Sequence, residues 1–246
     1  MVVKIIEDYY TKRKPEMMKN FSHELEIARE LLIKKFNEPK LDELFKQMKS
    51  EYEKLIPEIP YIGGLENMFT NILVISMSFL AMFRILEKEG LTLRDIGEFN
   101  YELWDIHSNM RKKEFLSISK NSAQYQFESA HVDLWKKLCE TSKLRNYPDD
   151  WVMDFVEGDG KTFEWGVNYY ECGIYKVFKR LDAEKYVHFF CLADYSDANI
   201  SGYGFTRSQA IGFGAPMCDH RYLREYKTPR GWPSDDLAEY KNKKYP

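Results

Sequence analysis

Apolar residues recur at helical spacing through the first 145 residues of the chain. Between residues 21 and 36, Leu25, Ala28 and Leu32 follow one another three or four positions apart, which places them on one face of a helix. Pro39 cannot continue that helix, so we expect the helix to end before this residue. The same spacing predicts further helices over residues 41–55, 68–86, 101–117 and 124–142.

Local signals mark where these helices begin and end. Residues 57–64 contain two prolines and end on a Gly-Gly pair, Gly63 and Gly64, so we predict irregular backbone that forms a lid or a wall of a pocket. Thr92 has Asp95 three residues later, a spacing suited to the N-cap of a helix.

The longest apolar run spans residues 68–83. It is interrupted by Thr70, Asn71 and Ser76, and it is shorter than the roughly 20 apolar residues that span a bilayer. We therefore predict a buried core helix and no membrane partner, with an interfacial helix as the alternative.

The pattern changes at Asn146. Residues 151–157 and 163–170 have strand character, and the Asp-Gly pair between them is a strong hairpin signal. Further along, we expect helices over residues 173–181 and 184–194 and strands over residues 202–209 and 214–223. The predicted fold is α+β, with a helical N-terminal region packed on a C-terminal α/β part that contains a small antiparallel sheet. The predicted divisions are a helical region (1–145), an α+β core (146–227) and an irregular tail (228–246).

Composition and charge narrow the possible partners. Hydrophobic residues make up 44% of the 246 residues and charged residues 30%, which is typical of a globular protein. The net charge is −3 and the charges are mixed along the chain, so nucleic acid is a poor partner. The four cysteines of a chain this long, with early charge and no secretory pattern at its start, are expected to be reduced thiols in the cytoplasm.

Three cysteines lie in the predicted α+β core. Cys172 precedes a predicted helix at Gly173, and the N–H groups at a helix start favour a thiolate. Cys191 and Asp194 are three residues apart, so a helix places both on one face.

The third cysteine opens a Cys-Asp-His-Arg segment. A strand alternates its side chains, which puts Cys218 and His220 on one face and Asp219 and Arg221 on the other. Any one of these thiols alone is more often a packed core residue than a catalytic one.

A metal site is the alternative reading of the same residues. Thiolate, imidazole and carboxylate groups all bind zinc. The chain has no Cys-x-x-Cys pair and no His-Glu-x-x-His motif, so we predict neither a metal nor another cofactor. Three histidines lie in the helical region without companion residues and are predicted to be structural: His23, His107 and His131.

The order of motifs from residue 151 to residue 224 resembles the L-2-amino-thiazoline-4-carboxylic acid hydrolase family. The ordered features are Asn168, Cys172-Gly173, Phe178, Cys191 with Asp194, Thr206-Arg207-Ser208-Gln209, Gly212, Gly214 and Cys218-Asp219-His220-Arg221-Tyr222. One position departs from the pattern, because the family is expected to carry an aromatic residue, usually Phe, where this chain has His220. The cysteine-bearing part is also distantly similar to the small-molecule-binding domain named after vinyl reductase.

The resemblance implies a hydrolase that acts on C–N bonds other than peptide bonds. Its named substrate is a cyclic isothiourea with a carboxylate, and the ring opens to N-carbamoyl-L-cysteine. A thiol could attack or position water, and Asp194 could act as a base. The implied catalytic residues are Cys172, Cys191, Asp194 and Cys218. The implied substrate-binding residues are Asn168, Arg207, Gly212, Gly214, Asp219, His220 and Arg221, with Arg207 or Arg221 as the carboxylate ligand.

Two other kinds of protein fit the sequence. A binding or sensor module would use the same cysteines to line a pocket for a small molecule or a metal, without turnover. A helical partner protein has only the long N-terminal helices in its favour. Met- and Phe-rich helices are also compatible with a homodimer.

Overall fold

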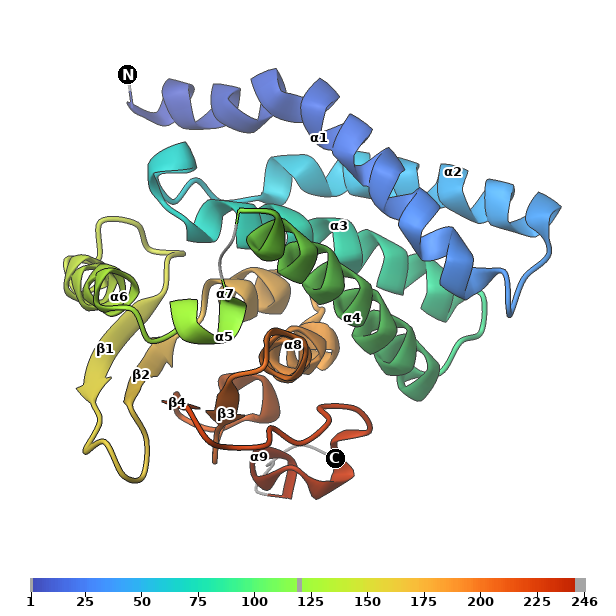
Figure 1. Cartoon of the computed structure of the whole chain (residues 1–246). Helices are drawn as coiled ribbons and strands as arrows, with labels where there is room; N and C mark the ends of the chain where they lie inside the picture. Colours follow the sequence, from blue (N-terminus) through green and yellow to red (C-terminus); the bar gives the residue numbers. More distant parts are fainter. Residues whose placement is uncertain (1, 119–120, 242–246) are drawn as a thin grey trace.

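The computed structural model describes residues 2–118 and 121–241, with side chains from Tyr9 onward. Helices form the N-terminal part, with α1 and α2 along one side of the molecule and α3 and α4 beneath them (Figure 1). The helices of this part are α1 (Val2–Leu32), α2 (Glu38–Leu55), α3 (Phe69–Lys88), α4 (Leu93–Ser117), α5 (Ser122–Tyr125) and α6 (Ser129–Ser142), with short 3-10 turns η1 (Ile56–Glu58) and η2 (Gly64–Glu66).

Helix α3 is the core helix of this part. It is long and apolar enough by length and composition to cross a membrane, but 72% of its most apolar window is buried inside the protein. Leu73, Met77 and Leu80 are fully buried in the hydrophobic core. The helix therefore uses its apolar surface for internal packing.

Four antiparallel strands form one sheet in the C-terminal part, in the order β1-β2-β4-β3. The strands are β1 (Val152–Glu157), β2 (Trp165–Glu171), β3 (Gly204–Thr206) and β4 (Cys218–Leu223). The predicted α+β class with a small antiparallel sheet is confirmed. The other elements here are α7 (Gly173–Arg180), η3 (Glu184–Tyr186), α8 (Val187–Ser201) and η4 (Ile211–Phe213).

Helix α8 lies at the centre of the molecule, between α4 and the strands β3 and β4 (Figure 1). Two hydrogen bonds join it to α4: Asn100 Nδ2 donates to Phe189 O (3.0 Å), and Ser196 Oγ donates to Asp105 Oδ1 (2.5 Å). One hydrophobic core includes residues of both parts. The helical part therefore packs directly on the part that carries the cysteines.

Several boundaries differ from the sequence prediction. Helix α8 continues to Ser201, seven residues beyond the predicted end, and stops at Gly202 with a φ of 87°. The predicted helix over 124–142 is two helices, because Glu128 is extended and starts α6. The predicted irregular tail contains η5 (Ser234–Asp236) and a short helix α9 (Ala238–Lys241).

Candidate functional site

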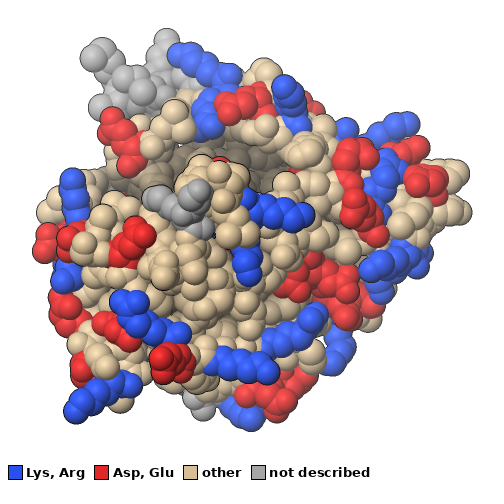
Figure 2. Space-filling view, in the orientation of Figure 1, with Lys and Arg blue, Asp and Glu red and all other residues tan. Residues whose placement is uncertain are grey.

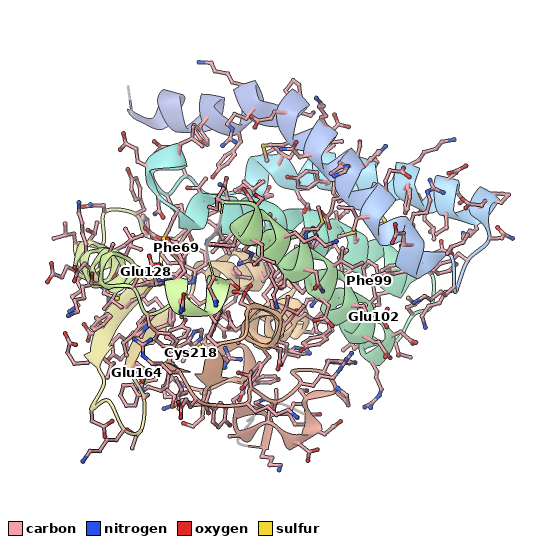
Figure 3. All side chains as sticks on the ribbon, viewed as in Figure 1. Phe69, Phe99, Glu102, Glu128, Glu164 and Cys218 are labelled. Carbon is pink, nitrogen blue, oxygen red and sulfur yellow. The ribbon has the colours of Figure 1, made fainter. Side chains whose placement is uncertain are left out.

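A cavity of about 1100 Å³ lies between the helical part and the sheet. Helices α1, α3 and α4 supply one side of its wall, and α7, α8 and β4 supply the other. Figure 2 shows the molecule hollowed on the side of α1. In Figure 3, Phe69 marks the helical side of this wall and Cys218 the sheet side. Six residues predicted from the sequence line it: Cys172, Cys191, Asp194, Arg207, Cys218 and His220.

The three thiols reach the cavity from three different elements. Cys172 is the N-cap residue of α7, and Cys191 lies on α8, where its thiol donates to Val187 O (3.7 Å). Cys218 opens β4, and its sulfur accepts a hydrogen bond from Ile211 N (3.2 Å). The three thiols come together because α7 and α8 pack against each other, and because η4, whose Ile211 donates to Cys218, packs on α8.

Burial keeps these thiols neutral. It raises the pKa of Cys172, Cys191 and Cys218 to about 12 each. At Cys172 the backbone N–H groups of Ile174 and Tyr175 lower the pKa, as the helix start predicted, but desolvation by burial is larger. The helix start thus favours the thiolate of Cys172, as expected, but burial outweighs this effect and raises the pKa.

Asp194 is the acidic group of the cavity wall. It lies on α8 one turn after Cys191, and its Oδ2 accepts a hydrogen bond from Arg207 Nη1 (3.0 Å). The side chain is 39% exposed, because one side of the carboxylate borders the hollow. Burial raises the pKa of Asp194 to about 6, and the Arg207 guanidinium opposes this rise. With this pKa the carboxyl group is mostly ionised at pH 7 and becomes protonated as the pH falls below about 6.

Arg207 is buried at the base of the site and uses all of its N–H groups within the protein. Its side chain is 1% exposed, and that of its partner Glu239, from α9, is 0% exposed. The five contacts of the guanidinium are Nε to Glu239 Oε1 (3.2 Å), Nη2 to Glu239 Oε1 (2.8 Å), Nη2 to Cys191 O (2.9 Å), Nη1 to Asp194 Oδ2 (3.0 Å) and Nη1 to His220 Nε2 (3.1 Å). A guanidinium has five N–H donors, so none is left for the carboxylate of a ligand.

His220 is a neutral imidazole in this network. Because Arg207 donates to Nε2, we assign the proton to Nδ1. Burial, with the charges of Arg207 and Arg221, holds the pKa of His220 well below its usual range. The ring lies against Tyr169 and Phe205, and its buried Nδ1 has no hydrogen-bond partner within the part of the chain that is described.

Three predicted substrate-binding residues lie on the opposite face of the sheet. Asp219 accepts hydrogen bonds from Ser208 N and Gln209 N (2.9 Å each), and Arg221 donates to Asn168 Oδ1 (2.9 Å). The alternation predicted for this strand is present, since its even-numbered residues are buried and face inward. Asn168, Asp219 and Arg221 are thus separated from the cavity by the sheet itself.

Gly212 and Gly214, the two glycines predicted to bind substrate, lie near the thiols of Cys191 and Cys172. A Cβ on Gly212 would lie 2.7 Å from the sulfur of Cys191, so this position needs glycine for close packing. Gly214, with a φ of 84°, borders a second, smaller cavity of about 330 Å³ beside Cys172.

The predicted lid over residues 57–64 is not part of the cavity wall. Tyr61 from this segment packs against Tyr9 and Tyr147 instead. Leu65 of η2, the residue that directly follows this segment, does line the cavity and is exposed. The segment ends on a Gly-Gly turn that orients η2 and the start of α3.

The helical side of the wall was not predicted from the sequence. His107 of α4, predicted to be structural, lies in the cavity with its Nε2 2.7 Å from Glu24 Oε1 of α1. One turn on, Arg111 Nη1 lies 3.3 Å from Asp197 Oδ1 of α8. The available signal was the spacing of Trp104, His107 and Arg111 along one helix face. Within residues 2–118 and 121–241, no group of three or more His, Cys, Asp or Glu side chains is arranged to hold a metal ion.

Comparison with known proteins assigns the family. No curated protein and no solved structure matches this chain, so the likeness to the vinyl-reductase domain stays a prediction. The family model described as L-2-amino-thiazoline-4-carboxylic acid hydrolase matches residues 74–222, which is more than half of the chain and includes six predicted residues of the cavity wall: Cys172, Cys191, Asp194, Arg207, Cys218 and His220. The family implies a small-molecule substrate and a hydrolase that acts on C–N bonds. The ordered motifs around the three thiols and the match of the family model agree, and the chain belongs to the L-2-amino-thiazoline-4-carboxylic acid hydrolase family.

Proposed function

We propose that this protein hydrolyses a 2-amino-thiazoline ring, with Asp194 as the residue that moves the proton. The observation that carries the proposal is a carboxylate on the cavity wall that a buried arginine fixes through one oxygen, while the other side of the group borders the hollow. Burial raises the pKa of this carboxyl group to about 6. Such a group is largely ionised at neutral pH and can still return a proton, as a general acid–base residue must. The family match supplies the substrate class.

The reaction adds water to the amidine carbon, the ring carbon between sulfur and nitrogen. The substrate enters as the amidinium cation, whose ring nitrogen already carries a proton, and Asp194 accepts a proton from the water as the water oxygen bonds to this carbon. The tetrahedral intermediate then collapses to a carbonyl group, releases its hydroxyl proton to solvent and breaks one ring bond. The protonated Asp194 gives its proton to the leaving atom, so the product is the substrate plus one water.

Which ring bond breaks decides the product. If the carbon–sulfur bond breaks, both nitrogens stay on the carbon, and the product is N-carbamoyl-L-cysteine with a free thiol. If the ring carbon–nitrogen bond breaks, the product is the S-carbamoyl isomer with a free amine. The two products have the same mass and differ in thiol content.

The three cysteines act in this proposal as a neutral wall that holds the ring beside Asp194. A thiol with a pKa of about 12 is almost wholly protonated at neutral pH, and the thiolate is the nucleophilic form. Cys191 lies one turn before Asp194 on α8, so its thiol is on the same face of the helix as the carboxylate. Replacing a single thiol by alanine is therefore expected to lower turnover less than replacing Asp194.

The test is incubation of the reduced protein with L-2-amino-thiazoline-4-carboxylate, with mass spectrometry for the water-added product and a thiol assay for the bond that breaks. We expect turnover by the wild type and a loss of about 100-fold or more in Asp194→Asn. The matched control is Asp219→Asn, on the far face of the sheet, which should keep its turnover. Full turnover by Asp194→Asn, with loss in Cys191→Ala, would replace this mechanism with covalent catalysis by the thiol.

A binding module without turnover is the second candidate. The neutrality of all three thiols favours it, since a pocket that only binds needs no reactive group. Saturable binding of the thiazoline by folded protein, with no water-added product, would favour this candidate over the hydrolase.

A further inference from the structure

The cavity wall carries more negative than positive side chains. Among the lining residues that the structure describes, five are carboxylates and three are arginines: Glu16, Glu24, Glu114, Asp194 and Asp197 against Arg13, Arg111 and Arg207. A low-dielectric hollow concentrates the field of its wall, so this cavity favours a cation over an anion.

Each lining arginine is already paired with a carboxylate. Arg13 lies 3.3 Å from Glu16 and Arg111 lies 3.3 Å from Asp197. Arg207 has no N–H left to donate. A ligand carboxylate would have to break one of these pairs and face the remaining acids. Like charges at close range repel each other strongly where water is partly excluded, so this placement of a ligand carboxylate is unfavourable.

Large hydrophobic side chains are exposed on the cavity lining, beside exposed polar and charged ones. Four of the lining side chains are large hydrophobic residues that are 39–76% exposed: Leu65, Ile72, Ile75 and Met110. Apolar residues gathered and exposed at the rim of a pocket mark a surface that a ligand covers.

Aromatic rings continue this apolar surface inward to the site. The ring of Phe79 lies 5.4 Å from that of Trp104 and 6.0 Å from that of Phe190, the neighbour of Cys191. The wall is thus aromatic from α4 across α3 to α8. Ring faces attract cations as well as apolar groups.

The cavity is also much larger than a thiazoline ring with one carboxylate. Cavities that enclose drug-sized ligands measure roughly 300–1000 Å³, and this one measures about 1100 Å³. Room therefore exists beside Asp194 for a substituent that reaches toward the rim.

We infer that the preferred ligand is a cationic cyclic amidine or isothiourea that carries a bulky apolar substituent in place of a carboxylate. Its charged amidine group pairs with Asp194, and its substituent lies along Phe79 and Trp104 toward Ile75. Turnover of such a ligand rests on the proposed hydrolase function, whereas its binding does not.

The test compares three ligands: L-2-amino-thiazoline-4-carboxylate, unsubstituted 2-amino-thiazoline, and 2-amino-thiazoline with a phenyl group on carbon 4. Titration calorimetry gives Kd for each, independently of turnover, and mass spectrometry gives kcat/KM. We expect the phenyl compound to bind at least about tenfold more tightly than the carboxylate compound, the rough effect of burying one ring of apolar surface.

A variant of one exposed hydrophobic lining residue tests whether the substituent lies along this part of the cavity. Ile75→Trp fills part of the cavity and should reduce the preference for phenyl over carboxylate, while Leu134→Trp on α6, equally exposed but outside the cavity, should leave it unchanged. Tighter binding of the carboxylate compound, or equal binding of all three, would overturn the inference. If the carboxylate compound is also turned over best, the hydrolase proposal stands and the inference fails. If the phenyl compound binds best without turnover, the inference stands and the hydrolase proposal fails.

Discussion

At the scale of single residues, Arg207 shows how one tertiary contact changes the role that a motif predicts. In the sequence it lies in Thr-Arg-Ser-Gln and is a candidate ligand for a carboxylate. In the structure Glu239 occupies two of its N–H groups, and the remaining three bind Asp194, His220 and the carbonyl of Cys191. Glu239 lies 32 residues further along the chain, outside the motifs that carry the resemblance, so the sequence offered no signal for this pair.

Removing Glu239 should destabilise the protein strongly. Glu239→Ala leaves the Arg207 charge buried without its main partner, which typically costs about 3–5 kcal/mol in the free energy of unfolding. Urea unfolding followed by circular dichroism measures this change. The control is Asp236→Asn, fully exposed in the same tail, which should change the free energy by less than about 0.5 kcal/mol. A change for Glu239→Ala as small as that of the control would mean that the tail does not hold Arg207.

The thiols should be slow to react while the protein is folded. A pKa of about 12 leaves Cys172, Cys191 and Cys218 with far less thiolate at pH 8 than an ordinary cysteine. We expect iodoacetamide to alkylate them at least about 100-fold more slowly in the native protein than in urea, as followed by peptide mass spectrometry. Rapid native alkylation of Cys172 or Cys191 would contradict neutral thiols and favour a nucleophilic role.

At the scale of elements, periodicity predicted most helices and strands but not where they end. The apolar spacing gives α2 and α3, and Asp-Gly gives the turn between β1 and β2, because these signals are local. The extension of α8 to Ser201 was missed because its polar residues find partners on α4, such as Ser196 with Asp105. The tail was predicted to be irregular because Pro229, Gly231 and Pro233 break regular structure, yet α9 forms after them and carries Glu239 to the core.

The N-terminus of α4 offers a test of an element that the sequence predicted correctly. Thr92 and Asp95 form a complete capping box, and Lys35, in the turn after α1, donates to Asp95 (2.8 Å). Thr92→Ala should lower the free energy of unfolding by about 1 kcal/mol, as measured in urea. Ser129→Ala, at the start of α6 where no side-chain cap bond forms, serves as the control and should have a smaller effect. If both substitutions lowered the free energy of unfolding by the same amount, the capping box would contribute no stability of its own.

At the scale of the whole molecule, the site is a cavity between two parts that the sequence analysis treated separately. Local motifs identified the wall made by α7, α8 and β4, where Cys172, Cys191 and Asp194 lie. The wall made by α1, α3 and α4 has no motif, since the pairing of Glu24 with His107 spans 83 residues and exists only after packing. The family match begins within α3 and ends in β4, so it covers α4 as well as the part that carries the cysteines, but not α1.

The pH dependence of turnover tests the central claim most directly, namely that Asp194 moves the proton in hydrolysis. The active form is the carboxylate, and burial sets its pKa at about 6, so kcat/KM should rise as pH increases through about 6 and level off above it. The same profile measured in Asp194→Asn should be lower by about 100-fold or more and should lack this rise. A wild-type profile that is flat between about pH 5 and pH 8, or a variant that keeps the rise, would show that another group carries the proton.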